Sequence, residues 1–82
     1  MSIWNVKYNG HDIRVENSWL SGERLFIDDE LQDMKKGLGL RSVLYGKIKQ
    51  SDGKDEEVRV SLGGWLTVDC HIFVDNKLVF PK

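Results

Sequence analysis

The stretch Glu57–Leu78, EVRVSLGGWLTVDCHIFVDNKL, contains the longest β-type pattern in the chain. Four apolar side chains recur in it at every second position: Val68, Cys70, Ile72 and Val74. Alternation with a period of two places these side chains on one face of a strand and the intervening ones on the other. Asp75-Asn76-Lys77 then interrupts the run before Leu78 resumes it, as in a β-hairpin. The stretch therefore predicts a core-facing strand, a turn and a further strand.

The earlier segment Asp12–Leu31 repeats this plan. Three groups of residues match at offsets of 45, 46 and 47: Ile13-Arg14-Val15 with Val58-Arg59-Val60, Trp19-Leu20 with Trp65-Leu66, and Phe26-Ile27-Asp28 and Leu31 with Phe73-Val74-Asp75 and Leu78. An offset that grows between elements is expected where insertions fall in loops. Two interpretations stand side by side. The chain contains an internal pseudo-two-fold repeat with halves 1–36 and 40–82, or short hairpins merely share a composition.

Length, charge and cysteine content exclude several classes of protein. The 82 residues correspond to one domain, 1–82. A formal net charge of -1 argues against nucleic acid as a partner, because backbone binding needs a positive surface. We expect no membrane partner, since no run of about 18 apolar residues is present, and the N-terminus lacks a signal-peptide pattern. The single cysteine cannot form an internal disulfide, which favours a reduced, cytoplasmic location.

The rest of the chain reads as short strands separated by turns. The predicted strands are 3–8, 11–16, 24–28, 42–49, 56–62 and the two in the opening stretch. Asn9-Gly10 between alternating runs is a strong hairpin signal, and Asp28-Asp29-Glu30 reads as a turn. Residues 32–42 fit a short strand, a loop or one helical turn, and the two glycines in this segment break any longer helix. We predict an all-β fold, a small antiparallel β-sandwich or flattened barrel of seven to eight strands, without a helix longer than about two turns.

The alternating pattern also predicts which side chains form the core. They are Trp4, Val6, Tyr8, Ile13, Val15, Leu25, Ile27, Leu44, Ile48, Val58, Val60, Val68, Cys70, Ile72 and Val74.

The order of motifs resembles the N-terminal domain of the Fas apoptotic inhibitory molecule family. The matching residues are Trp4-Asn5-Val6, Asn9-Gly10, His11, Ile13, Val15, Ser21-Gly22, Arg24, Ile27-Asp28 and Val74-Asp75. The match is looser from Gln32 to Gly64, Asp29 replaces a turn glycine of the family, and the second domain of the animal protein has no counterpart. The resemblance implies an antiparallel β-sandwich without catalytic activity that acts through protein contacts. The animal members of the family modulate death signalling.

Candidate catalytic and metal-binding patterns are weak in this sequence. Cys70 and His71 are adjacent, so they point to opposite faces of a strand and cannot form a nucleophile–base pair by themselves. Asp69 and His71 share a face, but the sequence ties no nucleophile to them. The His and Cys residues are too few and too scattered for a metal site, and we expect neither a metal nor a cofactor. Gly37-Leu38-Gly39 lies beside basic residues but precedes no helical pattern, so we favour a solvated loop over a phosphate-binding loop.

Trp19 and Trp65 are the most informative candidates for binding. They occupy matching positions in loops, where they either cap the ends of the core or contact a partner. We predict a non-catalytic β-sandwich, not an enzyme, that binds another protein or a copy of itself. The alternative is a small-ligand or carbohydrate-binding module that uses these loop tryptophans.

Overall fold

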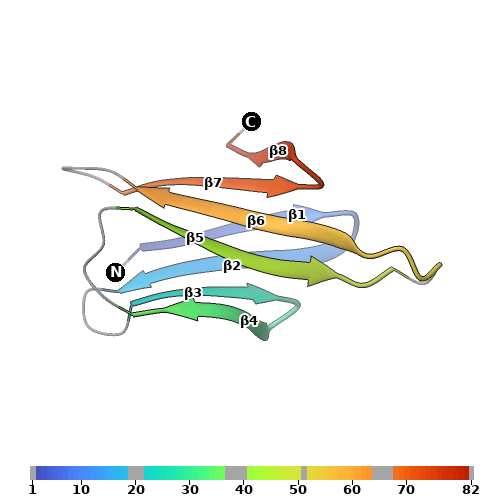
Figure 1. The fold of residues 1–82 in the computed structure, drawn as a ribbon, viewed down its shortest axis with the longest axis horizontal. Helices are drawn as coiled ribbons and strands as arrows, with labels where there is room; N and C mark the ends of the chain where they lie inside the picture. The colour runs from blue at the N-terminus through green and yellow to red at the C-terminus, as the bar shows by residue number, and fades with distance from the viewer. Residues whose placement is uncertain (1, 19–21, 37–40, 51, 64–67, 82) are drawn as a thin grey trace.

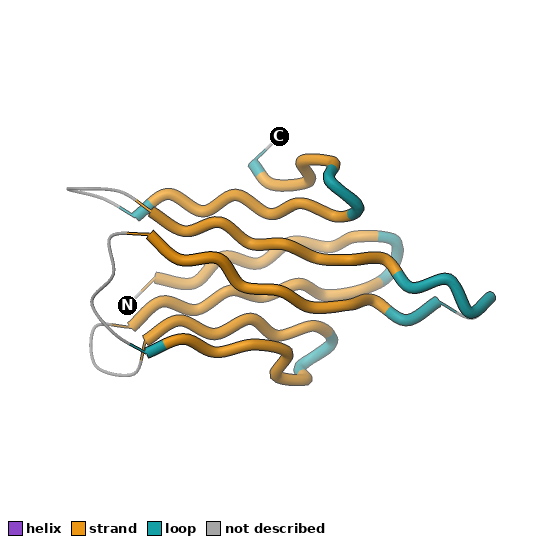
Figure 2. Tube along the Cα trace, in the orientation of Figure 1, coloured by secondary structure: helices purple, strands orange, loops and turns teal. Residues whose placement is uncertain are grey.

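Eight antiparallel strands and two sheets make up the computed structural model, which describes residues 2–18, 22–36, 41–50, 52–63 and 68–81 (Figure 1). The strands are β1 (Ser2–Tyr8), β2 (His11–Ser18), β3 (Gly22–Ile27), β4 (Glu30–Lys35), β5 (Arg41–Ile48), β6 (Glu56–Gly63), β7 (Asp69–Val74) and β8 (Lys77–Phe80). Sheet A has the order β1-β2-β3-β4 and sheet B the order β5-β6-β7-β8. No helix occurs in the described residues (Figure 2). The predicted all-β sandwich is confirmed.

Three tight turns at one end of the sandwich close the hairpins β1–β2, β3–β4 and β7–β8 (right in Figure 1). Their central residues are Asn9-Gly10, Asp28-Asp29 and Asp75-Asn76, and all six have positive φ. Positive φ at both central positions defines the type I′ turn, whose twist matches that of the flanking strands. The prediction of a three-residue turn at 28–30 was wrong, because two residues suffice and Glu30 already begins β4. The first part of the segment 32–42 is therefore a strand, since β4 extends to Lys35. Residues 37–40 of this segment lie outside the described ranges.

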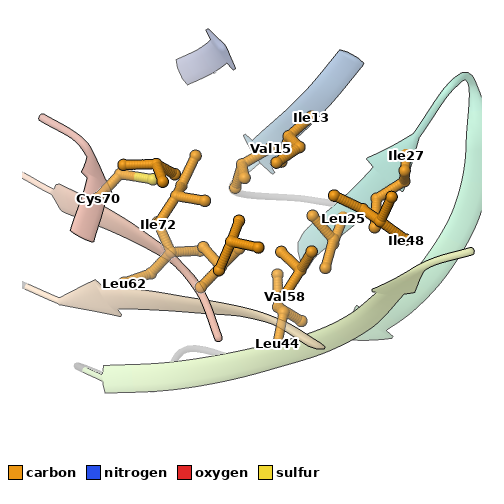
Figure 3. Packing of buried hydrophobic residues seen from close by; sticks show 13 residues of the cluster. Ile13, Val15, Leu25, Ile27, Leu44, Ile48, Val58, Leu62, Cys70 and Ile72 are labelled. Carbon is orange, nitrogen blue, oxygen red and sulfur yellow. The ribbon is translucent and has the colours of Figure 1, made fainter. Parts of the chain in front are cut away.

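The core contains side chains from both sheets (Figure 3). Its thirteen members are Ile13, Val15, Leu25, Ile27, Leu44, Ile48, Val58, Val60, Leu62, Cys70, Ile72, Val74 and Val79. Eleven of them belong to the predicted core. Trp4, Val6 and Tyr8 are only partly buried and pack against this cluster from β1. Period-two alternation therefore identified the buried face in most strands.

The predicted core was wrong at Val68, which is 40% exposed. Pairing between β6 and β7 begins at Gly63–Asp69, so Val68 precedes the ladder and the alternation does not extend to it. Leu62, buried opposite Cys70, was missed, and so was Val79. Val79 lies at an irregularity where the partners of Ile72 and Phe73 are not consecutive, which a regular alternation does not anticipate.

The two sheets approach each other closely where β5 crosses β3 and β4. A Cβ atom at Gly46 would lie 3.1 Å from the Leu25 Cδ2, Ile27 Cδ1 and Gln32 Cβ atoms. A hydrogen bond also joins the two sheets: the Tyr8 hydroxyl on β1 donates to the Glu56 carboxylate on β6 at 2.7 Å. The absence of a side chain at Gly46 thus lets the two layers pack tightly at this crossing.

The registers of the two sheets correspond at the offsets predicted from the sequence. Residues Ile13, Arg14 and Val15 pair with Ile27, Phe26 and Leu25, and the matching residues Val58, Arg59 and Val60 pair with Val74, Phe73 and Ile72. Both halves have a bulge at the same point, with Gln32 and Val79 as the extra residues. Shared bulges are specific features that common composition does not explain, and they favour the repeat. The two-fold rotation between the halves remains a prediction.

Candidate functional site

Trp19 and Trp65, the candidates from the sequence, lie outside the described residues. The strands that flank them are described: β2 and β6 end, and β3 and β7 begin, at the end of the sandwich opposite to the tight turns (left in Figure 1). Their assignment to a contact surface stays a prediction.

The sheets have four free edges, and three of them carry features that hinder pairing with another chain. Strand β8 has four residues and a bulge. Strand β4 has a bulge at Gln32 and three charged residues, Glu30, Asp33 and Lys35. Short length, bulges and charges are the usual means by which edge strands avoid association.

The edge of β5 is covered by side chains of β4. The Asp33 carboxylate accepts a hydrogen bond of 2.9 Å from the Tyr45 backbone amide and another of 2.8 Å from the Met34 amide. The Gln32 side-chain oxygen accepts a longer bond of 3.4 Å from the Lys47 amide. These side chains occupy acceptor positions that the carbonyl groups of a neighbouring strand would otherwise fill.

The edge of β1 has no bulge and is the least protected of the four edges. Its seven residues pair with β2 in an unbroken register, and it carries one charge, on Lys7, which forms an ion pair of 3.0 Å with Asp12. Within the described part of the chain, no side chain hydrogen-bonds to the main chain of β1. Ile3 is 56% exposed. The strand was visible in the sequence, but its edge position depends on the sheet order.

The hydrogen-bond pattern of the hairpin shows which β1 groups face away from β2. A two-residue turn makes Tyr8 and His11 a hydrogen-bonded pair, and such pairs then recur at every second residue. The main-chain groups of Ile3, Asn5 and Lys7 consequently point to the free edge. They provide alternating donors and acceptors for an added strand.

A groove of about 740 Å³ lies between the β3–β4 turn and β5, at the end with the tight turns. Its apolar wall comes from Ile27 and Ile48. Its polar lining includes His11, Asp28, Glu30, Gln32, Lys47, Lys49 and Glu57. The volume is within the range of small-molecule sites. The described lining contains no Ser, Thr or Cys side chain that His11 is able to activate.

His11 and Asp28 form the closest polar pair in this groove, with 2.7 Å between the Nδ1 and carboxylate oxygen atoms. This hydrogen bond, with a second from the Asp12 amide, lowers the pKa of Asp28. The Asp12 amide bond of 2.9 Å has a counterpart in the other half, where Asp75 accepts from the Glu57 amide at the same distance. The second half closes its turn without a histidine, so we assign Asp28 primarily to turn closure.

The remaining catalytic and metal-binding candidates from the sequence do not form a common site in the described structure. Cys70 is a free thiol, 5% exposed, and burial raises its pKa to about 12. Its predicted burial is confirmed. Asp69 and His71 are exposed on the outer side of β7. Among the residues that the structure describes, no group of three or more His, Cys, Asp or Glu side chains is arranged to hold a metal ion. Gly37 and Gly39 lie outside those residues.

Comparisons with known proteins give no match to a family model, a curated protein or a solved structure. In the described ranges, no helix has the length and apolar character needed to cross a membrane.

Proposed function

We propose that this protein is a non-catalytic β-sandwich module that acts through protein contacts, and that the free edge of β1 is its contact surface. The supporting observation is the contrast among the four edges. The edges of β4, β5 and β8 are shortened, bulged, charged or covered, whereas β1 is long and regular. An edge of this kind is a template for an added strand.

The occupant we propose is an extended segment of a partner protein with apolar residues at alternate positions. The amide and carbonyl groups of Ile3, Asn5 and Lys7 would pair with its main chain. Trp4 and Val6, half-buried on the core side of β1, would contact its apolar side chains. The single charge on the edge favours a segment of low charge. The resemblance to the Fas apoptotic inhibitory molecule family supports the same class of function. The single free cysteine supports a cytoplasmic location.

A second copy of the chain is the competing occupant. Antiparallel pairing of two β1 strands about Asn5 would place Trp4 opposite Val6 and Ile3 opposite Lys7, with no like charges facing each other. Light scattering over a range of protein concentrations separates the two cases. Two results together would assign the edge to self-association. The mass of the wild-type protein doubles as its concentration rises, and the Asn5→Pro variant stays monomeric over the same range.

Selection of a random peptide library on the wild-type protein, with counter-selection on Asn5→Pro, tests the partner proposal. Proline at position 5 removes an outward amide donor but leaves the ladder to β2 intact, and edge strands tolerate proline. Selected peptides should protect the Ile3, Asn5 and Lys7 amides from hydrogen exchange. The variant Ile3→Lys, which adds a charge to the edge, should weaken the same peptides. Protection confined to other strands would refute the assignment.

Small-ligand binding is a second candidate, favoured by the groove beside His11 and Asp28. A fragment screen by NMR tests it, and shifts at Ile27 and Ile48 would support it.

The tryptophans are tested separately. Trp19→Ala and Trp65→Ala should each lower stability by roughly 3–5 kcal/mol if the side chains cap the core. A contact residue should change stability by about 1 kcal/mol or less but weaken binding in a pull-down.

A further inference from the structure

Each sheet carries an arginine stacked on a phenylalanine on its outer face. In sheet A the Arg14 guanidinium carbon lies 4.3 Å from the centre of the Phe26 ring. In sheet B the Arg59 guanidinium carbon lies 4.5 Å from the centre of the Phe73 ring. The two pairs occupy corresponding positions in the registers of their sheets. Stacking of this kind holds the guanidinium plane against an apolar surface.

The two arginines differ in their ionic partners. Arg14 forms ion pairs of 3.2 Å with Glu16 and 2.5 Å with Asp29. The corresponding positions in sheet B, at the same offsets of 45 and 47, are occupied by Ser61 and Asn76. Both carboxylates are therefore replaced by neutral side chains around Arg59.

No other described residue forms an ion pair with Arg59. No Asp or Glu oxygen of the described residues lies within 4.0 Å of the Arg59 side chain, including Glu57, two residues earlier on the same face. The segments outside the described residues contain no Asp or Glu. Arg59 therefore has no carboxylate partner within ion-pair distance among the described residues, and its side chain is half-buried.

Exposed apolar side chains flank this arginine. The register places Tyr45, Arg59, Phe73 and Leu78 in one row across the four strands of sheet B. The end members of the row are accessible, since Tyr45 is 52% exposed and Leu78 is 45% exposed. Interfaces are enriched in aromatic residues and arginine, and a central arginine beside apolar side chains is a common anchor.

We propose that this row binds an acidic segment of a partner protein, in which an Asp or Glu carboxylate pairs with Arg59 and apolar neighbours contact Tyr45 and Leu78. The planar guanidinium presents parallel donors that fit a carboxylate. The partner would supply in sheet B the charge that Glu16 and Asp29 supply in sheet A. This site is separate from the β1 edge and does not depend on strand addition there.

Grafting the carboxylates of sheet A onto sheet B tests the proposal. The probe is a short synthetic peptide with one Glu between apolar residues, and its control has Gln in place of Glu. The double variant S61E/N76D should bind the Glu peptide about tenfold more weakly than wild type, the scale of one charge-assisted hydrogen bond. Asn76 has positive φ, as does Asp29, so the turn should accept Asp.

The reverse graft in sheet A is the matched control. The variant E16S/D29N should expose Arg14 and create a second site for the Glu peptide. Titration followed through the Arg side-chain Nε–H signals identifies which arginine responds, and thermal melts establish that each variant is folded. Equal binding of the Glu and Gln peptides, no binding of either, or unchanged affinity in a folded S61E/N76D variant would overturn the proposal.

Discussion

Replacing Gly46 with alanine tests the account of how the two sheets pack. The new methyl group would point into the space between β5 and the strands β3 and β4. Its carbon would lie 3.1 Å from each of three atoms, in Leu25, Ile27 and Gln32. Contacts this short require the neighbours to move, and Leu25 and Ile27 are buried. The substitution should therefore overpack the interface between the sheets.

The size of the effect follows from two opposing contributions. Overpacking a close-packed core costs roughly 1–3 kcal/mol. Removing a glycine from the middle of a strand returns roughly 0.5–1 kcal/mol, because alanine loses less backbone entropy on folding. The midpoints of these two ranges differ by about 1 kcal/mol, so Gly46→Ala should lower the free energy of unfolding by about that amount. In urea, with a denaturant dependence near 1 kcal/mol per molar, the midpoint should fall by about 1 M.

A double-mutant cycle with Ile27→Val establishes whether overpacking is the cause. Valine lacks the Cδ1 atom that meets the added methyl group, and by itself should cost about 0.5–1.5 kcal/mol. The double variant should then be more stable than the sum of the single changes predicts, by about 0.5 kcal/mol or more. Strict additivity, or a Gly46→Ala variant as stable as wild type, would refute the packing argument.

Three further predictions concern single side chains. The Cys70 thiol should react slowly with a thiol reagent in the native protein at neutral pH, because it is buried and its pKa is raised to about 12, and Cys70→Ser should cost roughly 1–3 kcal/mol in urea denaturation. Leu62→Ala should cost about 2–5 kcal/mol, whereas Val68→Ala, at an exposed position, should change stability by about 0.5 kcal/mol, measured in the same way. The hydrogen bond from His11 lowers the folded-state pKa of Asp28 below its ordinary value of 3.8, so its stabilising contribution is present above that pH and is lost as pH falls through the lower folded value. Asp28→Asn should accordingly reduce the dependence of stability on pH below about 4, as measured by denaturation over a pH series.

The candidate sites were accessible from the sequence to different degrees. The Arg14–Phe26 and Arg59–Phe73 pairs lie at matched positions of the two segments in the sequence. The ionic partners of the two arginines were not apparent from the sequence. Arg14 meets Asp29 across 15 residues of chain, and only the register of β2 and β3 brings them together. The tryptophan loops, chosen from the repeat, lie outside the described residues. The β1 edge was not chosen, because a strand pattern does not show how many neighbours the strand has.

Local pattern determined the strand faces and the tight turns of this protein. Alternation with a period of two fixes which side of a strand is apolar, and Asn9-Gly10 accepts positive φ without a partner elsewhere in the chain. Ile13, Val60 and Ile72 were therefore assigned to the core from the sequence alone. These properties depend on neighbouring residues and on the conformational preferences of each residue.

The tertiary structure decided the division into two sheets, the exposure of Val68 and the acceptors that cover the edge of β5. Asp33 reaches the Tyr45 amide 12 residues away because the chain crosses from one sheet to the other between them. Val68 is exposed because the β6–β7 ladder begins one residue later. Among the described residues, Arg59 forms no ion pair, whereas Arg14 pairs with Glu16 and Asp29. Pairing between strands depends on contacts between distant segments, and a period of two is the same whichever strands are neighbours.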